Sequence, residues 1–200
     1  MLQLVIFLGN PGLMYRYNRH NAAWMLADAI PFLSEIAWQN KFKGLHTSVD
    51  GIHFLKPQDF MNRCGESAHT AASFYKIDPE NIIIVHDEIE LSFGTLSLKF
   101  SGGMGGHNGL RSIKNSFDSA DFWRLRLGIG RPDSRIPGKG GNPESSREAG
   151  IADWVLSDFT DAENEMLAEV FTIGGELLVQ ALKSGPEQLL PEWAKKRVVQ

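Results

Sequence analysis

The chain has 200 residues, with 20 basic and 24 acidic side chains, a formal net charge of −4 and one cysteine, Cys64. This length suits one domain with a sizeable core, and a lone cysteine excludes a disulfide framework and favours a reducing compartment. No apolar run approaches the length of a membrane span. We therefore expect a cytoplasmic enzyme or binding protein that forms a single domain over residues 1–200.

The basic residues gather in one part of the chain. Residues 99–139 contain eight Lys or Arg against three Asp, whereas residues 140–180 contain nine acids and one Arg. The pattern indicates either two solvated surfaces of opposite sign or a local basic face for phosphate groups. Charge alone does not decide between these alternatives.

The first half of the chain predicts a central strand, a broken helix and a hairpin. Residues 2–8 form a nearly continuous apolar run, which is typical of a buried parallel strand. A helical pattern follows, and Pro31 predicts a break near Ile30 because proline does not fit inside a helix. The dipeptide Asp50-Gly51 lies between residues 45–49 and 52–55 and is a strong signal for a two-residue hairpin turn.

The second half alternates strands with helices. Arg124 and Arg126 alternate with apolar residues, so one face of their strand should be basic. This alternation predicts an α/β fold of a single layered domain, with a mixed, largely parallel twisted sheet flanked by helices and a hairpin at one edge. The predicted elements are strands at 82–85, 95–99 and 122–129, helices near 68–75, 108–117 and 161–184 (the last long and amphipathic), and a mobile loop at 131–150.

Ionisable side chains follow two of the predicted strands. His86, Asp87 and Glu88 come directly after the isoleucine-rich strand, and His20 follows the turn after the first strand. In a parallel sheet the loops after two strands can meet at one edge, where open α/β sheets carry their sites. A histidine that a carboxylate orients can deprotonate water near neutral pH. His20 and Asp87 are therefore a candidate catalytic pair.

Three asparagines, Asn10, Asn62 and Asn108, lie in turns or at a helix start. Capping a turn is the ordinary role of such asparagines, whereas three of them at one site could orient a carbonyl group and stabilise an oxyanion. A run of glycines at 102–106 leads into the helix that begins near Asn108. A glycine turn before a helix N-terminus predicts a site for an anion or a carbonyl oxygen.

Other kinds of site receive less support from the sequence. The chain contains no P-loop pattern. The side chains of His86, Asp87, Glu88 and His107 are possible metal ligands, but consecutive strand residues point to opposite faces of a sheet. At most two of the first three could then share an ion, and paired histidines at helical spacing are missing. We predict no metal and no other cofactor.

Five segments of the chain resemble bacterial peptidyl-tRNA hydrolases in order and spacing: LGNPGLMYRYNRHN, KPQDFMNRCG, VHDEIEL, GGMGGHNGLRSI and FWRLRLGIGRP. Together they cover most of residues 4–132. The resemblance implies hydrolysis of the ester that joins a peptide to the terminal ribose of tRNA, which returns the tRNA to translation. The chain departs from the family pattern at Phe7 and Ser101, where glycine is usual, and in a longer segment after Arg131.

The resemblance also implies roles for individual residues. His20 is expected to be the general base, Asp87 to orient and charge it, and Asn10 to position the ester and the attacking water. The remaining assignments are Tyr15, Met61, Asn62 and Asn108 for binding the substrate, and Lys99 with Arg126 for the 5′ phosphate of the acceptor stem.

The expected partner is peptidyl-tRNA, bound through its acceptor stem, its 3′ end and the C-terminal part of the peptide. We expect no membrane association and a monomer. Two alternatives stay open: a non-catalytic RNA-binding relative of the same fold, such as plant organelle splicing factors, and a metal-dependent hydrolase that uses the His-Asp-Glu triplet.

Overall fold

The apolar strand β1 (Leu4–Phe7) lies near the centre of an eight-stranded sheet with the order β2-β3-β4-β1-β5-β7-β6-β8. The structure is a computed structural model that describes residues 1–132 and 150–199. β1 pairs in parallel with β4 (Ile52–Pro57) and β5 (Ile82–Glu88), and β5 pairs in parallel with β7 (Trp123–Gly128). The segments that follow β1 and β5 therefore leave the sheet on the same side, at the carboxyl ends of these strands.

Antiparallel strands lie at both edges of the sheet. β2 (Gln39–Lys41) and β3 (Gly44–Val49) extend it beyond β4, and β6 (Thr95–Phe100) and β8 (Lys196–Arg197) extend it beyond β7. The predicted mixed sheet is confirmed, but it is less parallel than expected. The chain between β5 and β6 is too short for a parallel crossover, which needs a dozen or more residues, so β6 runs antiparallel to β7.

The predicted turn signals are confirmed. Asp50 and Gly51 join β3 to β4 with backbone φ angles of 50° and 79°, the left-handed values that this kind of hairpin turn requires. Ile30 is extended, with φ −76° and ψ 116°, and separates α1 (Ala22–Ala29) from α2 (Pro31–Ser34).

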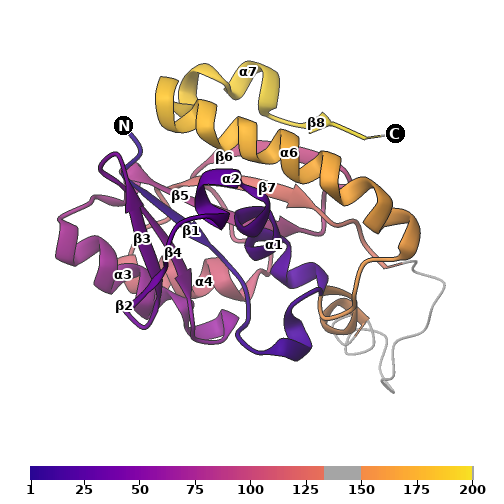
Figure 1. The fold of residues 1–200 in the computed structure, drawn as a ribbon, viewed down its shortest axis with the longest axis horizontal. Helices are drawn as coiled ribbons and strands as arrows, with labels where there is room; N and C mark the ends of the chain where they lie inside the picture. Colours follow the sequence, from indigo (N-terminus) through magenta and orange to yellow (C-terminus); the bar gives the residue numbers. More distant parts are fainter. Residues whose placement is uncertain (133–149, 200) are drawn as a thin grey trace.

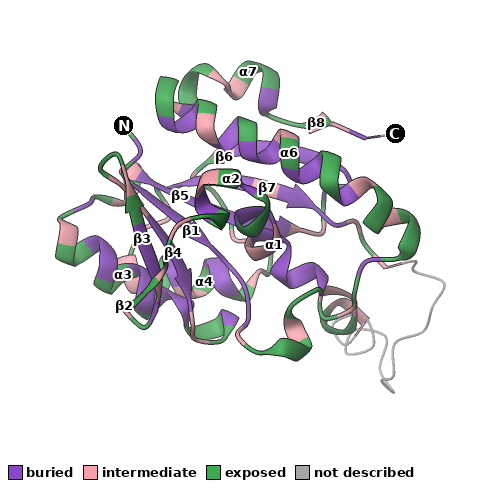
Figure 2. Cartoon of the chain, viewed as in Figure 1, coloured by how far each residue is buried: buried purple, intermediate pink, exposed green. Residues whose placement is uncertain are grey.

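Helices cover both faces of the sheet (Figure 1). Along β1, Val5 and Phe7 point into one buried cluster and Leu4 and Ile6 into the other, as the period of two in a strand requires. The burial pattern follows this layering, with exposed residues on the outer helix surfaces (Figure 2). The first cluster includes residues of α1, α2, α6 (Asp161–Ser184) and α7 (Leu190–Trp193), and the second includes residues of α3 (Cys64–Tyr75) and α4 (Asn108–Phe117).

Short helical turns complete the described chain: η1 (Leu13–Tyr15), η2 (Arg19–Asn21), η3 (Met61–Arg63), η4 (Pro79–Asn81), η5 (Pro186–Gln188) and a helix over 150–155. The loop predicted at 131–150 falls almost wholly on residues 133–149, outside the described residues. None of the described helices combines the length and apolar character needed to cross a bilayer.

Candidate active site

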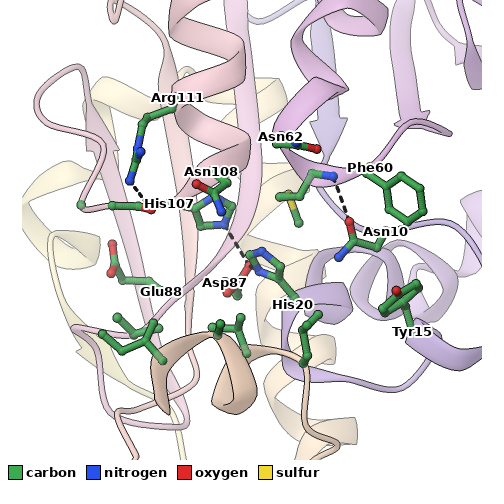
Figure 3. Close-up of a pocket in the computed structure, with 18 of the residues that line it drawn as sticks. Asn10, Tyr15, His20, Phe60, Asn62, Asp87, Glu88, His107, Asn108 and Arg111 are labelled. Atoms are coloured by element: carbon green, nitrogen blue, oxygen red, sulfur yellow. Dashed lines mark hydrogen bonds and ion pairs between the residues drawn. The ribbon is translucent and has the colours of Figure 1, made fainter. Parts of the chain in front are cut away.

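The imidazole of His20 lies against the carboxylate of Asp87, as the neighbouring positions of β1 and β5 predict (Figure 3). Nδ1 of His20 is 2.8 Å from Oδ1 of Asp87. Asp87 is near the end of β5 and only 1% exposed, and His20 lies in η2 and is 8% exposed. Both residues line a pocket with a volume of about 860 Å³.

Arg19 anchors the segment that carries His20. Its guanidinium donates to both carboxylate oxygens of Glu163, at 2.8 and 2.7 Å, and lies 3.8 Å from the centre of the Trp154 ring. Its backbone N–H donates to the carbonyl of Ser157 at 2.9 Å. A buried, bidentate arginine has little freedom to change rotamer. The first turn of α6 therefore holds the histidine segment in place, a contact between residues 144 positions apart that no sequence pattern predicts.

His107 also binds Asp87, a role that the sequence analysis missed. Nε2 of His107 is 3.0 Å from Oδ1 of Asp87, and Nδ1 accepts the backbone N–H groups of Gly109 and Leu110 at 3.1 and 3.3 Å. Because Nδ1 accepts, the proton of a neutral ring must be on Nε2, which donates to Asp87. Both nitrogens of His107 are thus occupied, and the position of His107 before a helix start was the available sign of an N-cap.

The same contact corrects one prediction for the glycine run. The N-terminus of α4 was expected to offer free N–H groups to an anion or a carbonyl oxygen. His107 already accepts two of these N–H groups, so they are not available to a ligand. Gly105 and Gly106 still line the pocket, with positive φ angles of 57° and 78°.

Of the two histidines that line the pocket, His20 and His107, only His20 keeps a nitrogen for chemistry in the structure as described. Its Nδ1–H donates to Asp87, so Nε2 carries a lone pair and has no hydrogen-bond partner among the residues that the structure describes. Burial lowers the pKa of His20, but the charge of Asp87 and the hydrogen bond to it act in the opposite direction and leave the pKa above its ordinary 6.5.

Asp87 remains ionised in this arrangement. Burial raises the pKa of its carboxyl group. The two neighbouring imidazoles, His20 and His107, lower this pKa by more than burial raises it and hold it well below its usual range. Oδ1 accepts from both rings, while Oδ2 is buried without a partner in the described part of the chain. The carboxylate therefore directs its charge at the two histidines.

The side chain of Asn10 has a defined orientation in the pocket. Its Oδ1 accepts the backbone N–H of Met61 at 2.8 Å (Figure 3), and the side chain of Asn21 bonds both the N–H and the carbonyl of Asn10, at 2.8 and 2.9 Å. Since the oxygen is occupied by a donor, the amide NH₂ of Asn10 is the group left for a ligand.

The other predicted substrate-binding residues line the same pocket. They come from different elements: Tyr15 from η1, Met61 and Asn62 from η3, and Asn108 from the first position of α4. The Tyr15 ring meets the Phe60 ring edge-on, with 6.2 Å between their centroids. Apolar side chains complete one wall of the pocket: Ile151, Ala152, Val155 and Leu156.

Lys99 and Arg126 do not line this pocket. They lie on β6 and β7, where the ladder places Ser97 opposite Arg126 and Arg124 opposite Lys99. Arg126 donates to Oγ of Ser97 at 2.7 Å and lies 3.6 Å from Oε2 of Glu88. Because Glu88 lines the pocket and pairs with Arg126, these two basic residues lie beside the pocket and not in it.

His20, Asp87 and His107 form a second kind of candidate site, because one ligand atom from each lies within 4.8 Å of the others. The sequence placed Asp87 and His107 among four possible ligands, together with His86 and Glu88, but His20 was not among them. In the tautomers inferred above, one nitrogen of each ring carries a proton and donates it to Asp87. A metal would have to displace both protons, so the hydrogen-bonded triad fits these groups better.

Comparisons with known proteins agree with this geometry. The family described as peptidyl-tRNA hydrolase matches residues 4–199. A peptidyl-tRNA hydrolase of Treponema pallidum is 40% identical over 99% of this chain and 97% of its own length, and one of Desulfitobacterium hafniense is 37% identical over 94% and 97%. A crystal structure of peptidyl-tRNA hydrolase from Acinetobacter baumannii superposes with a TM-score of 0.81 at 30% identity, covering 96% of this chain and 94% of the other. The chain belongs to the peptidyl-tRNA hydrolase family.

Proposed function

We propose that this protein hydrolyses the ester bond between peptide and tRNA in peptidyl-tRNA and releases free tRNA for reuse in translation. Membership of the family supports the reaction. The observation that carries the mechanism is the bond between Nδ1 of His20 and Asp87, because it leaves Nε2 of His20 unprotonated in the pocket. Ester hydrolysis needs an activated water and a stabilised oxyanion.

In the mechanism that we propose, His20 is the general base. Nε2 takes a proton from a water molecule as the water attacks the ester carbonyl, and the imidazolium that forms is stabilised by the ionised Asp87. His107 holds Asp87 from the other side and does not act as a base, since both of its nitrogens are occupied. The proton then passes from His20 to the leaving ribose oxygen.

The asparagines bind the reacting groups. The free NH₂ of Asn10 donates to the ester carbonyl, where negative charge develops in the transition state. Asn62 on η3 and Asn108 on α4 hold the water and the peptide. Tyr15 and Met61 provide apolar surface for the 3′ end and the peptide. Because these contacts are made to the main chain of the peptide, binding does not depend on the identity of its side chains, which suits a substrate with arbitrary peptides.

Lys99 and Arg126 bind the 5′ phosphate of the acceptor stem in this proposal. A contact to a phosphate fixes the register of the RNA without reading its sequence, so one site can serve different tRNAs. We further propose that residues 1–200 act as one domain and a monomer in the cytoplasm, without a metal or other cofactor. The match of the family over 4–199 supports one functional unit.

Hydrolysis of an N-acylated aminoacyl-tRNA by the purified chain, with and without chelator, tests this function. The proposal predicts release of free tRNA that chelator does not change. Binding of the RNA without hydrolysis would favour a non-catalytic relative of the family. Loss of hydrolysis on chelation, with recovery on adding zinc, would favour a metal-dependent hydrolase.

A further inference from the structure

Arg124 is a buried cation whose surroundings do not account for it. The residue is 2% exposed, and of its guanidinium atoms Nη1 alone has a partner, the carbonyl of Gly103 at 2.9 Å. Nε and Nη2 are buried without hydrogen-bond partners among residues 1–132 and 150–199. An unpaired buried cation is costly. Burial lowers the pKa of Arg124, as does the charge of Arg126, and the charge of Glu88 offsets only part of this.

Arg124 lies between the two basic residues that were predicted to hold a phosphate. On the ladder it is directly opposite Lys99, and Arg126 lies two residues further along the same strand and on the same face. Gly102 borders the group: a Cβ at that position would be 3.3 Å from Nη2 of Arg124 and 3.4 Å from Nζ of Lys99. The nearest atom to this Cβ would be Cε of Lys99, at 3.2 Å, so the backbone of Gly102 packs closely over both cations and a larger residue would not fit without a shift.

Negative charge in this cluster is scarce. In the described part of the chain, the one ion pair to any of the three cations is that of Arg126 with Glu88, at 3.6 Å. Three cations and one carboxylate leave an excess of two positive charges. A phosphate monoester carries a charge between about −1.5 and −2 at pH 7, whereas a phosphodiester of the RNA backbone carries a single negative charge. The charge of the cluster matches the monoester.

A purely structural role explains Arg124 less well. Its bond to Gly103 fixes the glycine segment, but one backbone contact needs one donor and leaves two others unsatisfied. The ring of Phe122 is 5.9 Å from the guanidinium carbon, at the outer limit of a cation–π contact. Neither contact neutralises the charge.

We propose that Arg124 is the buried floor of a phosphate-monoester site that Lys99 and Arg126 complete. The occupant is the 5′-terminal phosphate of the tRNA, so the inference rests on the proposed function and adds a specificity-determining residue to it. When the phosphate binds, the backbone at Gly102 moves aside, and a phosphate oxygen accepts from Nη2 of Arg124 and contacts the ammonium of Lys99. A tRNA whose 5′ end carries a hydroxyl group in place of the phosphate leaves the positive charge of the three cations unneutralised.

The test compares two peptidyl minihelix substrates that differ only in a 5′ monophosphate or a 5′ hydroxyl. The full chain should cleave the phosphorylated substrate with the higher kcat/KM. In Arg124→Gln this preference should fall by about tenfold, the usual effect of one lost charge-assisted hydrogen bond. A merely structural role would lower both rates together and keep their ratio. Lys183→Gln, an exposed charge on α6, is the matched control and should keep the ratio of the unaltered chain.

Three outcomes would overturn the inference. In the first, Arg124→Gln folds and retains the full preference, so Arg124 does not contribute to the site. In the second, the unaltered chain cleaves both substrates equally well, which removes the phosphate site but leaves the proposed function standing. In the third, a 5′-extended substrate, with a phosphodiester in place of the monoester, is cleaved as well as the phosphorylated one, which shows a backbone site. If the unaltered chain cleaves none of the substrates, the proposed function itself fails.

A second measurement serves if Arg124→Gln does not fold. In the unaltered chain, the NMR signal of the Nε–H group of Arg124 should move when the 5′-phosphorylated minihelix is added and should move less with the hydroxyl form. The variant Arg124→Lys, which keeps the charge but not the fork of donors, identifies this signal by its absence. Equal movement with both RNAs would contradict the assignment.

Discussion

The substitution Asp87→Asn removes the negative charge of the carboxylate but keeps a side chain of the same shape in the same place. The asparagine oxygen can take the place of Oδ1 and accept from His20 and His107, while the NH₂ group takes the place of Oδ2, which has no partner among the described residues. The hydrogen bonds then persist but are no longer charge-assisted. What is lost is the attraction between the carboxylate and the imidazolium that forms in the transition state.

The size of this loss follows from the distance between the two groups. At an effective dielectric constant of about 20, opposite unit charges 2.8 Å apart attract by about 6 kcal/mol, which is an upper limit of about 10⁴-fold on the rate. The amide dipole of asparagine recovers part of this energy. We therefore expect kcat/KM for peptidyl-tRNA to fall by roughly 10²- to 10⁴-fold.

The pH profile gives a second and more specific readout. A general base must be unprotonated, so kcat/KM of the unaltered chain should rise as the pH rises through the pKa of His20, which lies above 6.5. Burial, the largest influence on this pKa, lowers it and is opposed by Asp87. In Asp87→Asn the rise should therefore move to a pH below 6.5. Steady-state hydrolysis from pH 5 to 9 would measure both effects.

Two results would refute this reasoning: a loss of less than tenfold, or a pH profile that stays in place. Glu88→Gln is the matched control, because it removes the neighbouring carboxylate, which pairs with Arg126 and makes no hydrogen bond to His20 in the structure as described. Its profile should rise at the same pH as that of the unaltered chain.

Three further predictions concern the metal, the phosphate site and the packing of the pocket. Chelator should leave kcat unchanged, since no proposed step uses an ion; loss of activity that zinc restores would contradict this. Lys99→Ala should lower the slope of log affinity for tRNA against log salt by about one unit, and an unchanged slope in a binding titration would argue against a phosphate contact. Gly109→Ala should lower the free energy of unfolding by about 1–3 kcal/mol in a urea titration, because its Cβ would be 2.5 Å from Sδ of Met61 and 2.9 Å from Leu8. Gly103→Ala, where nothing lies within 4 Å, is the control and should unfold at the same urea concentration as the unaltered chain.

Short sequence patterns predicted one strand, one helix break and one turn of the fold. The apolar run of β1, the break at Ile30 and the turn at Asp50 and Gly51 follow from burial, proline geometry and left-handed backbone angles, and all three are confirmed. The edge strands were missed because β2 is polar and β8 has two residues, so neither carries a hydrophobic pattern.

The candidate site was predictable where it depends on the order of parallel strands. His20 and Asp87 meet because β1 and β5 are neighbours, and alternating strands and helices already indicate a parallel arrangement. The contact of Arg19 with Glu163 and the second bond to Asp87 depend on how distant segments pack, which residue types alone do not reveal. The burial of Arg124 was missed for the same reason, since alternation on a strand predicts a face but not what covers it.

The most direct test of the account is His20→Ala, assayed for both hydrolysis of peptidyl-tRNA and binding of tRNA. We expect hydrolysis to fall by about 10²-fold or more while the dissociation constant for tRNA stays near that of the unaltered chain, because the proposed phosphate-binding residues, Lys99 and Arg126, lie outside the pocket that holds the histidine. Retention of substantial turnover by this variant, with its fold intact, would contradict the claim that His20 activates the water.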